Sequence, residues 1–402
     1  MKRFFFILVV FFLLHAQPAP LLAQSTGKAT AFSLDLTALE KNKSLIANND
    51  PVISEAYKSL VKDAAKAMRF EPVSVMEKGN LPPSGDKHDY MSLAPYFWPD
   101  PAKADGLPYL RKDGQTNPEV KNYKDKEHMP KLCEQVNILA LAYYFSGDNS
   151  YAEHAATLLR VWFLDPATKM NPNLNYAQAI KGVNEGRGAG LIDTRHFVKL
   201  IDGIGLLQTS KAWKTADQKG MQQWFAGFLN WMQTSKNGID EMNAKNNHGT
   251  WYDAQRLAMA LFIDSSDMAK KIISNVTRRL DSQVDDTGFF PAEMTRTISL
   301  HYTAFAMEPF FIIANMAERT GFNLFDHVTP SGKSLKRSFA ALKPYFTREK
   351  KWEGEQIKDY DPEDGYIILM EAAKHYACKD CVQAVKTLAA DKASRLRINL
   401  LY

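Results

Sequence analysis

Apolar residues recur at helical spacing along most of this chain. Apolar positions three and four residues apart mark segments in which one face of a helix would be hydrophobic. These segments are 53–70, 132–145, 151–163, 197–207, 221–232, 251–262, 268–280, 300–317, 335–345 and 365–376. Stretches in which apolar and polar residues alternate, as in a half-buried strand, are scarce. The pattern therefore predicts an all-α protein.

Residues with capping side chains precede several of the predicted helices. Residues 148–150 read Asp-Asn-Ser, residues 265–267 read Ser-Ser-Asp, and Thr215 and Asp217 precede the segment at 221. Such side chains accept hydrogen bonds from the free N–H groups of a first helical turn. The turns between helices are short and polar, which favours antiparallel helix pairs. No linker interrupts the series, so we expect one domain over residues 24–402.

Three segments break the helical rhythm. Residues 81–130 are rich in Pro, Asp, Tyr and Gly, and residues 170–195 are rich in Asn and Gly. Residues 285–294 contain Asp-Asp-Thr-Gly followed by a proline. Long irregular segments inside a compact domain usually carry function. We expect these three to gather at one mouth of the helical domain.

The first residues have the pattern of a secretory signal peptide. Lys2 and Arg3 precede an apolar run at 4–14 that is too short to cross a bilayer, and a small-residue cleavage pattern ends at Ala23. We expect residues 1–23 to be removed and the protein to be exported, to the periplasm in a Gram-negative source. No later apolar run is long enough for a membrane span, so no membrane insertion is expected.

The net charge is a weak indication of the partner. The chain carries 50 basic and 45 acidic residues, a formal charge of +5. This charge falls to +3 when Lys2 and Arg3 leave with the signal peptide. A mildly basic surface suits an anionic polymer, whereas a nucleic-acid-binding protein needs a concentrated basic stripe. We therefore expect no nucleic-acid partner.

The three cysteines indicate a local disulfide. Cys378 and Cys381 form a C-x-x-C pair, which in an exported protein is more often a disulfide than a redox centre. A second such pair or a histidine pair would be needed for a zinc site, and the sequence has neither. Cys133 lies in a helical apolar pattern, so we expect it to be buried.

Four residues in two neighbouring segments could carry chemistry. Asn247 and His248 precede an apolar helix, and Arg296 and Tyr302 lie about fifty residues later. A simpler interpretation makes Asn247 a helix cap, Arg296 a solvated residue and Tyr302 a core residue. Six residues on one helix would place Arg296 and Tyr302 on different faces. They can converge only if Arg296 lies before the helix, and Pro291 permits this. We interpret His301 as a packing residue.

An amide, an imidazole, a guanidinium and a phenol together suit β-elimination beside a uronic acid carboxylate. Such a reaction requires the carboxylate charge to be neutralised, the C5 proton to be removed and the leaving oxygen to be protonated. Arginine donates two parallel hydrogen bonds to a carboxylate, and asparagine and histidine add further donors. A tyrosine can act as a base when nearby positive charge lowers its pKa, and then as an acid. The chemistry needs no metal and no cofactor.

The sequence resembles the helical-toroid alginate lyases, and specifically polysaccharide lyase families 5 and 38. The resemblance rests on Asn-Asn-His-Gly-Thr-Trp-Tyr at 246–252, Arg296, and Leu-His-Tyr at 300–302. Further matching segments are 87–90, 94–101, 106–109, 176–178, 186–188 and 192–195. The resemblance implies an (α/α) toroid, a partly closed ring of antiparallel helix pairs. It also implies a polyuronate substrate, with mannuronate-rich alginate as the leading expectation.

The resemblance implies a role for each of the four residues. Asn247, His248 and Arg296 would neutralise the carboxylate. Tyr302 would be the general acid, and also the general base for mannuronate, in which the C5 proton and the leaving oxygen lie on the same face. For guluronate, the opposite epimer, His248 would be better placed as the base.

Other residues are candidates for substrate binding. Tyr90, Tyr96 and Trp98 could stack on sugar rings, or they could be core aromatics of a packed loop. Arg187 could reach the cleft, or it could form a buried ion pair with Glu185 or Asp193. The remaining candidates of this kind are His88, Arg195 and Lys245.

Three alternatives stay open at this point. A glucuronan lyase would use the same mechanism on a different polyuronate. A helical-toroid glycoside hydrolase would need two facing carboxylates, for which the candidates are Asp89, Glu185, Asp193 and Asp253. A non-catalytic glycan-binding protein would bind the polymer without turnover.

Overall fold

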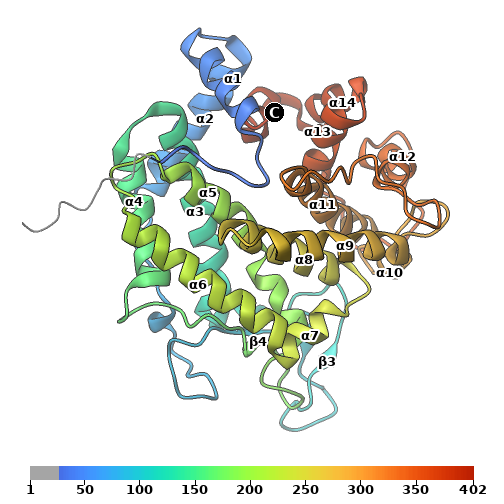
Figure 1. Cartoon of the computed structure of the whole chain (residues 1–402). Coiled ribbons are helices and arrows are strands. Elements are labelled where there is room, and N and C mark those ends of the chain that lie inside the picture. Colours follow the sequence, from blue (N-terminus) through green and yellow to red (C-terminus); the bar gives the residue numbers. More distant parts are fainter. Residues whose placement is uncertain (1–26) are drawn as a thin grey trace, which may run out of the picture.

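The chain folds into a ring of helix pairs, seen face-on in the computed structural model of Figure 1, which describes residues 27–402. The predicted signal peptide, 1–23, lies outside the described residues. The helices are α1 (Leu36–Ala47), α2 (Pro51–Ala67), α3 (Lys124–Ser146), α4 (Asn149–Leu159), α5 (Phe197–Leu207), α6 (Thr215–Thr234), α7 (Lys236–Met242), α8 (Asn247–Phe262), α9 (Ser266–Gln283), α10 (Pro291–Met294), α11 (Ser299–Glu318), α12 (Leu335–Phe346), α13 (Tyr366–His375) and α14 (Lys379–Ala389). The prediction of an all-α toroid is confirmed.

The inner helices of the ring are α3, α5, α8, α11 and α13, and each packs against the next. α8 and α11 are buried on nearly all sides. An outer helix such as α9 buries only one stripe, with Ala269, Ile272, Ile273, Val276 and Leu280 at helical spacing. This difference in burial follows from the sequence, because a helix that is apolar all round must be covered on every side.

The predicted helices are present, and most begin earlier than predicted. Asp148 caps α4 by accepting a hydrogen bond from the N–H of Ser150, as expected. The irregular segment predicted to end at residue 130 ends at 123, because α3 begins at Lys124 and accommodates Pro130 near its start. The short helices α1, α7, α10 and α14 were not predicted.

Short strands join the irregular segments to one another. β1 (Met91–Leu93) pairs in parallel with β4 (Tyr176–Ala179), and β2 (Phe97–Trp98) pairs antiparallel with β3 (Leu110–Arg111). The first pair connects the irregular segments 81–123 and 170–195. These two of the three irregular segments therefore gather on one side of the ring, at the lower edge of Figure 1, whereas the third leads into α10 at the right of that view.

The cysteines behave as the sequence predicts. Cys378 and Cys381 form a disulfide at the start of α14, and Cys133 is a buried free thiol. The C-terminal segment packs on α1 and α2, the first two helices. Within residues 27–402, no helix has the length and hydropathy of a bilayer span.

Asn42 fastens the C-terminal segment to α1. This buried side chain donates hydrogen bonds to the carbonyl oxygens of Leu400, at 3.1 Å, and Tyr402, at 2.9 Å. We expect Asn42→Ala to lower the free energy of unfolding by about 2 kcal/mol, because it leaves buried carbonyl groups without donors. Chemical denaturation measures this, with the exposed Ser44→Ala on the same helix as the control. Equal stability of the two variants would contradict the account.

Candidate active site

One elongated cavity of about 690 Å³ lies on the inner side of the ring and contains all four predicted catalytic side chains. Asn247 and His248 come from the start of α8, Tyr302 comes from the first turn of α11, and Arg296 precedes that helix. The irregular segments supply Tyr96, Phe97, Arg111, Gln178 and Arg187 to the same cavity. The two sequence segments that suggested the chemistry, one with Asn247 and His248 and the other with Arg296 and Tyr302, are therefore brought together.

The turn between α7 and α8 sets the positions of Asn247 and His248. Asn246, not Asn247 as the simpler interpretation had it, caps α8 by accepting a hydrogen bond from the N–H of His248. Gly249 is required because a Cβ there would lie 2.0 Å from Nη1 of Arg279. The Arg279 guanidinium donates to the carbonyl oxygens of Met242 and Ala244 and to the Asp253 carboxylate. This arginine holds the turn in place.

Asn247 is fully buried and is fixed by Glu293. Its backbone N–H donates to Oε1 of Glu293 at 2.6 Å, and its Nδ2 lies 3.0 Å from both carboxyl oxygens. Oδ1 of Asn247 has no partner among residues 27–402. Burial raises the pKa of Glu293, although the hydrogen bonds from Asn247 oppose the shift. No role for Glu293 was predicted from the sequence.

His248 is oriented by Glu241. Nδ1 of His248 lies 2.7 Å from Oε1 of Glu241, whose side chain is buried. A carboxylate at Nδ1 fixes the ring orientation and favours a proton on that nitrogen. Nε2 is then the nitrogen available to a ligand, and it has no protein partner in the described part of the chain. Glu241 was not predicted from the sequence, because nothing in its seven-residue separation from His248 identifies the pair.

Arg296 lies before α11, which begins at Ser299, and this placement lets it meet Tyr302. Its guanidinium carbon lies 3.5 Å from the centre of the Tyr302 ring. Nε and Nη2 of Arg296 donate to Asp113 at 3.0 and 2.8 Å. Burial would raise the pKa of Asp113, but the hydrogen bonds from Arg296 and from the N–H of Thr297 outweigh it and hold the pKa at about 2.

The hydroxyl of Tyr302 meets that of Tyr96. The two oxygens are 2.7 Å apart. Burial is the main cause that raises the pKa of Tyr302, the phenol of Tyr96 adds to the rise, and the positive charge of Arg296 opposes it. Tyr302 is therefore protonated at neutral pH in this structure, a form that can donate a proton.

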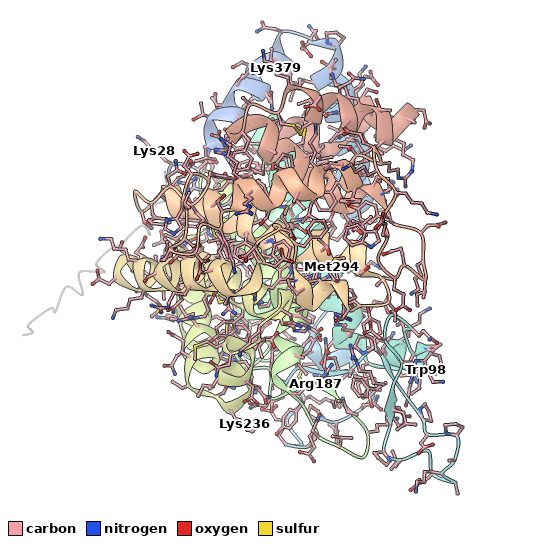
Figure 2. The ribbon with its side chains drawn as sticks, turned by 90° about the vertical axis from the view of Figure 1, so that its right-hand side faces the viewer. Lys28, Trp98, Arg187, Lys236, Met294 and Lys379 are labelled. Carbon is pink, nitrogen blue, oxygen red and sulfur yellow. A yellow bond between two sulfur atoms is a disulfide. The ribbon has the colours of Figure 1, made fainter. Side chains whose placement is uncertain are left out.

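Arg187 lines the cavity, and neither predicted ion pair forms. Its Nη2 donates to Oε1 of Gln178 at 2.8 Å, and its guanidinium lies 5.2 Å from the Phe97 ring. No salt bridge joins it to Glu185 or Asp193 within the described residues. Figure 2 shows Arg187 and Trp98 on the side of the irregular segments, far from Lys379.

Four predicted binding residues do not line the cavity. Tyr90 is fully buried and its hydroxyl donates to Asp193, so it cannot stack on a sugar ring. Trp98 points away because successive side chains of a strand face opposite sides, and Phe97 takes the cavity side instead. Nδ1 of His88 donates to the carbonyl oxygen of Lys169. Lys245 is exposed on the surface.

The carboxylates considered for a hydrolase lie outside the cavity. Asp193 is buried between Lys126, Ser92 and Tyr90, and Asp253 binds Arg279. Asp89 accepts hydrogen bonds from two asparagines, and Glu185 is exposed. The acidic residues that do line the cavity are Glu241, Glu308 and Asp364.

His301 also lines the cavity, although we had interpreted it as a packing residue. Its Nδ1 lies 2.6 Å from Oδ2 of Asp364. Its ring stacks on Phe305, with 6.0 Å between the ring centres. The placement follows from the helix, because Phe305 lies one turn after His301 on the same face.

Comparison with known proteins gives the following matches. The chain matches the model of the alginate lyase family over residues 74–352. It is similar to the structure of an alginate lyase from Bacteroides ovatus, with 39% identity, a TM-score of 0.88, and coverage of 93% of this chain and 99% of that one. It shares the fold of alginate lyase A1-III from Sphingomonas species A1, with 16% identity, a TM-score of 0.54 and coverage of 96% and 99%.

A variant of A1-III complexed with a tetrasaccharide matches with 16% identity and a TM-score of 0.53, covering 96% of this chain and 98% of that one. Among curated protein sequences, none matches the chain.

The Asp113–Arg296 pair predicts a pH-dependent stability. The pKa of Asp113 is depressed from 3.8 to about 2, so its stabilisation is present above pH 3.8 and is lost as the pH falls towards 2. We expect Asp113→Asn to lower the free energy of unfolding at pH 7 by about 2 kcal/mol. Urea denaturation at pH 7 and at successively lower pH measures the free energy of unfolding of the variant and of wild type. The difference between them should disappear as the pH approaches 2.

The exposed Asp286→Asn serves as the control and should match wild type throughout. A difference between Asp113→Asn and wild type that persists unchanged at pH 2 would show that the ion pair is not its source.

Proposed function

The chain belongs to the alginate lyase family and is a polysaccharide lyase, and we propose that it cleaves mannuronate-rich alginate by β-elimination. The observation that carries the proposal is the convergence of Asn247, His248, Arg296 and Tyr302 in one cavity. The tetrasaccharide complex of a protein with the same fold supports an oligosaccharide in this cavity. We also propose that the enzyme is exported, because residues 1–23 have the pattern of a signal peptide.

The substrate carboxylate would bind at Asn247 and His248. We take Glu293, whose pKa is raised by burial, to be protonated in the reacting enzyme. A protonated Glu293 can donate to Oδ1 of Asn247 while it still accepts from the Asn247 N–H. The Asn247 amide would then have the opposite orientation to the one in this structure. Its Nδ2 would face the cavity and donate to the substrate carboxylate. The His248 ring, which Glu241 holds in place, would supply the second contact.

Tyr302 would transfer both protons. Its phenolate removes the C5 proton, and the electron pair moves towards the carboxylate to form an enolate-like intermediate. The C4–O bond then breaks to leave a C4–C5 double bond, and the Tyr302 phenol protonates the departing oxygen. One group can serve both steps only when the C5 proton and the leaving oxygen lie on the same face, which is the case for mannuronate. This requirement is the reason for proposing that substrate.

Arg296 would act chiefly on Tyr302. Two of its nitrogen atoms are committed to Asp113, and its guanidinium lies against the Tyr302 ring. A cation at this position stabilises a phenolate more than a phenol. Asp113 would hold the guanidinium there, and the charge on the substrate carboxylate would be neutralised mainly from the α8 side.

The direct test is ultraviolet absorbance over time with polymannuronate, polyguluronate and glucuronan in separate reactions. Unsaturated products absorb, so the proposal predicts the fastest rise with polymannuronate. A rise with glucuronan alone would make the chain a glucuronan lyase. New reducing ends without any absorbance would indicate hydrolysis, and binding without products would indicate a glycan-binding protein.

Removal of the Tyr302 hydroxyl should abolish turnover. We expect Tyr302→Phe to lower kcat by about a thousandfold, the usual contribution of a proton-transferring group. Binding of a mannuronate oligosaccharide, measured by calorimetry, should stay near that of wild type. Tyr143→Phe, on α3 and outside the cavity, is the matched control. Substantial activity in Tyr302→Phe would refute the proposed acid and base.

The rate should rise with pH. Tyr302 is protonated at neutral pH because burial raises its pKa, and below that pKa each pH unit increases the phenolate fraction tenfold. We therefore expect kcat/KM on polymannuronate to increase from pH 7 to pH 9. A profile that falls over this range would show that a phenolate is not the base.

A further inference from the structure

The cavity continues past the proposed catalytic residues to an inner end. Phe305, Glu308 and Ile312 follow Tyr302 along the cavity side of α11 at spacings of three and four residues. A rise of 1.5 Å per residue places Glu308 about 9 Å beyond Tyr302 along the helix axis. The cavity therefore has room beyond the sugar that is cleaved.

The start of α5 and the 3₁₀ helix before it, η4 (Gly188–His196), form the opposite wall of this inner end. They supply Arg195, His196 and Lys199. The guanidinium of Arg195 lies 5.5 Å from the Phe305 ring, so the two walls face each other there. Lys199 is exposed to solvent.

Two cations at the inner end have no carboxylate partner in the described part of the chain. Elsewhere along the cavity wall Arg296 and Arg111 bind Asp113, Lys126 binds Asp193, and Arg187 donates to Gln178. In contrast, neither Arg195 nor Lys199 has a carboxylate within ion-pair distance among residues 27–402. The Arg195 side chain donates only to the carbonyl oxygen of Ile192, at 3.2 Å.

Glu308 and His196 are the other polar groups at the inner end, and Asp364, which pairs with His301, also acts on Glu308. Burial raises the pKa of Glu308, and the charges of Lys199 and Arg195 only partly offset the rise. Burial and the same two cations lower the pKa of His196 to about 3, which keeps its ring neutral. A neutral carboxyl and a neutral imidazole can each donate and accept hydrogen bonds. Neither has a hydrogen-bond partner in the described chain.

We propose that this inner end is a binding subsite for the uronate residue next to the one being cleaved. Lys199 and Arg195 bind its carboxylate, and His196 and Glu308 bind its hydroxyl groups. The inference rests on the proposed function, because a polyuronate carries one carboxylate on every residue. Each sugar drawn into the cavity brings a charge that is costly to bury without a partner. The catalytic end neutralises one carboxylate, and the inner end supplies free cations for the next.

The test uses Lys199→Met, because Lys199 is exposed and its replacement leaves the core intact. We expect KM on polymannuronate to rise about tenfold with little change in kcat, because the contact is made equally in the ground and transition states. KM of the variant should also depend less on salt concentration than that of wild type. Lys199→Arg should restore both properties. Lys270→Met, an exposed lysine on the outer helix α9, should match wild type.

Calorimetric titration with a mannuronate oligosaccharide separates the two proposals. If Lys199→Met binds the oligosaccharide about tenfold more weakly than wild type does, the result supports the subsite, whether or not the enzyme cleaves the polymer. Equal binding, equal KM and equal salt dependence of Lys199→Met and wild type would overturn it and leave the proposed function intact. If wild type releases no unsaturated product, the proposed function fails. If it also binds no oligosaccharide, the subsite fails with it.

Discussion

The ion pair between Asp113 and Arg296 is the contact on which the active site depends. Asp113 belongs to the irregular segment that also carries Tyr96, whereas Arg296 precedes α11. The pair therefore fixes the irregular segment to the helix that carries Tyr302. Because Arg296 also lies against the Tyr302 ring, one carboxylate sets both the position of a wall of the cavity and the electrostatic surroundings of the phenol. Charge-assisted bonds of this kind are strong when they are partly buried.

A second buried carboxylate organises the other wall. Asp193 accepts hydrogen bonds from Tyr90, Ser92 and Gln178 and pairs with Lys126. These partners come from β1, β4 and α3, so their bonds to Asp193 join the irregular segments to the ring. A buried carboxylate is tolerated only with this number of partners. The backbone at Gln178 has a φ of 50°, a conformation that such a network can hold at a functional site.

The sequence predicted the helices well because the periodicity of their apolar residues is set by the core. It also predicted that Arg296 must precede its helix, since six residues cannot otherwise bring it to Tyr302. The arrangement of the helices in a ring was predicted only from the resemblance. The periodicity of apolar residues shows where helices form but not how they are arranged in space. Glu241 could not be predicted, because nothing in its seven-residue separation from His248 identifies the pair. Asp113 could not be predicted, because its role depends on a contact with a distant segment. Tyr90 and Trp98 were misplaced for a related reason. Aromatic residues in a loop are equally suited to a core and to a sugar-binding surface. Only the alternation of side chains along β2 places Phe97, and not Trp98, on the cavity side.

The central claim is that the carboxylate is held from α8 while Tyr302 reaches both C5 and the leaving oxygen from α11. A crystal structure of Tyr302→Phe with a mannuronate oligosaccharide tests it most directly. The account predicts the carboxylate within hydrogen-bond distance of Asn247 and His248, with C5 and the glycosidic oxygen facing the ring at position 302. A sugar bound with its carboxylate away from α8, or with its C5 proton facing His248, would contradict the account.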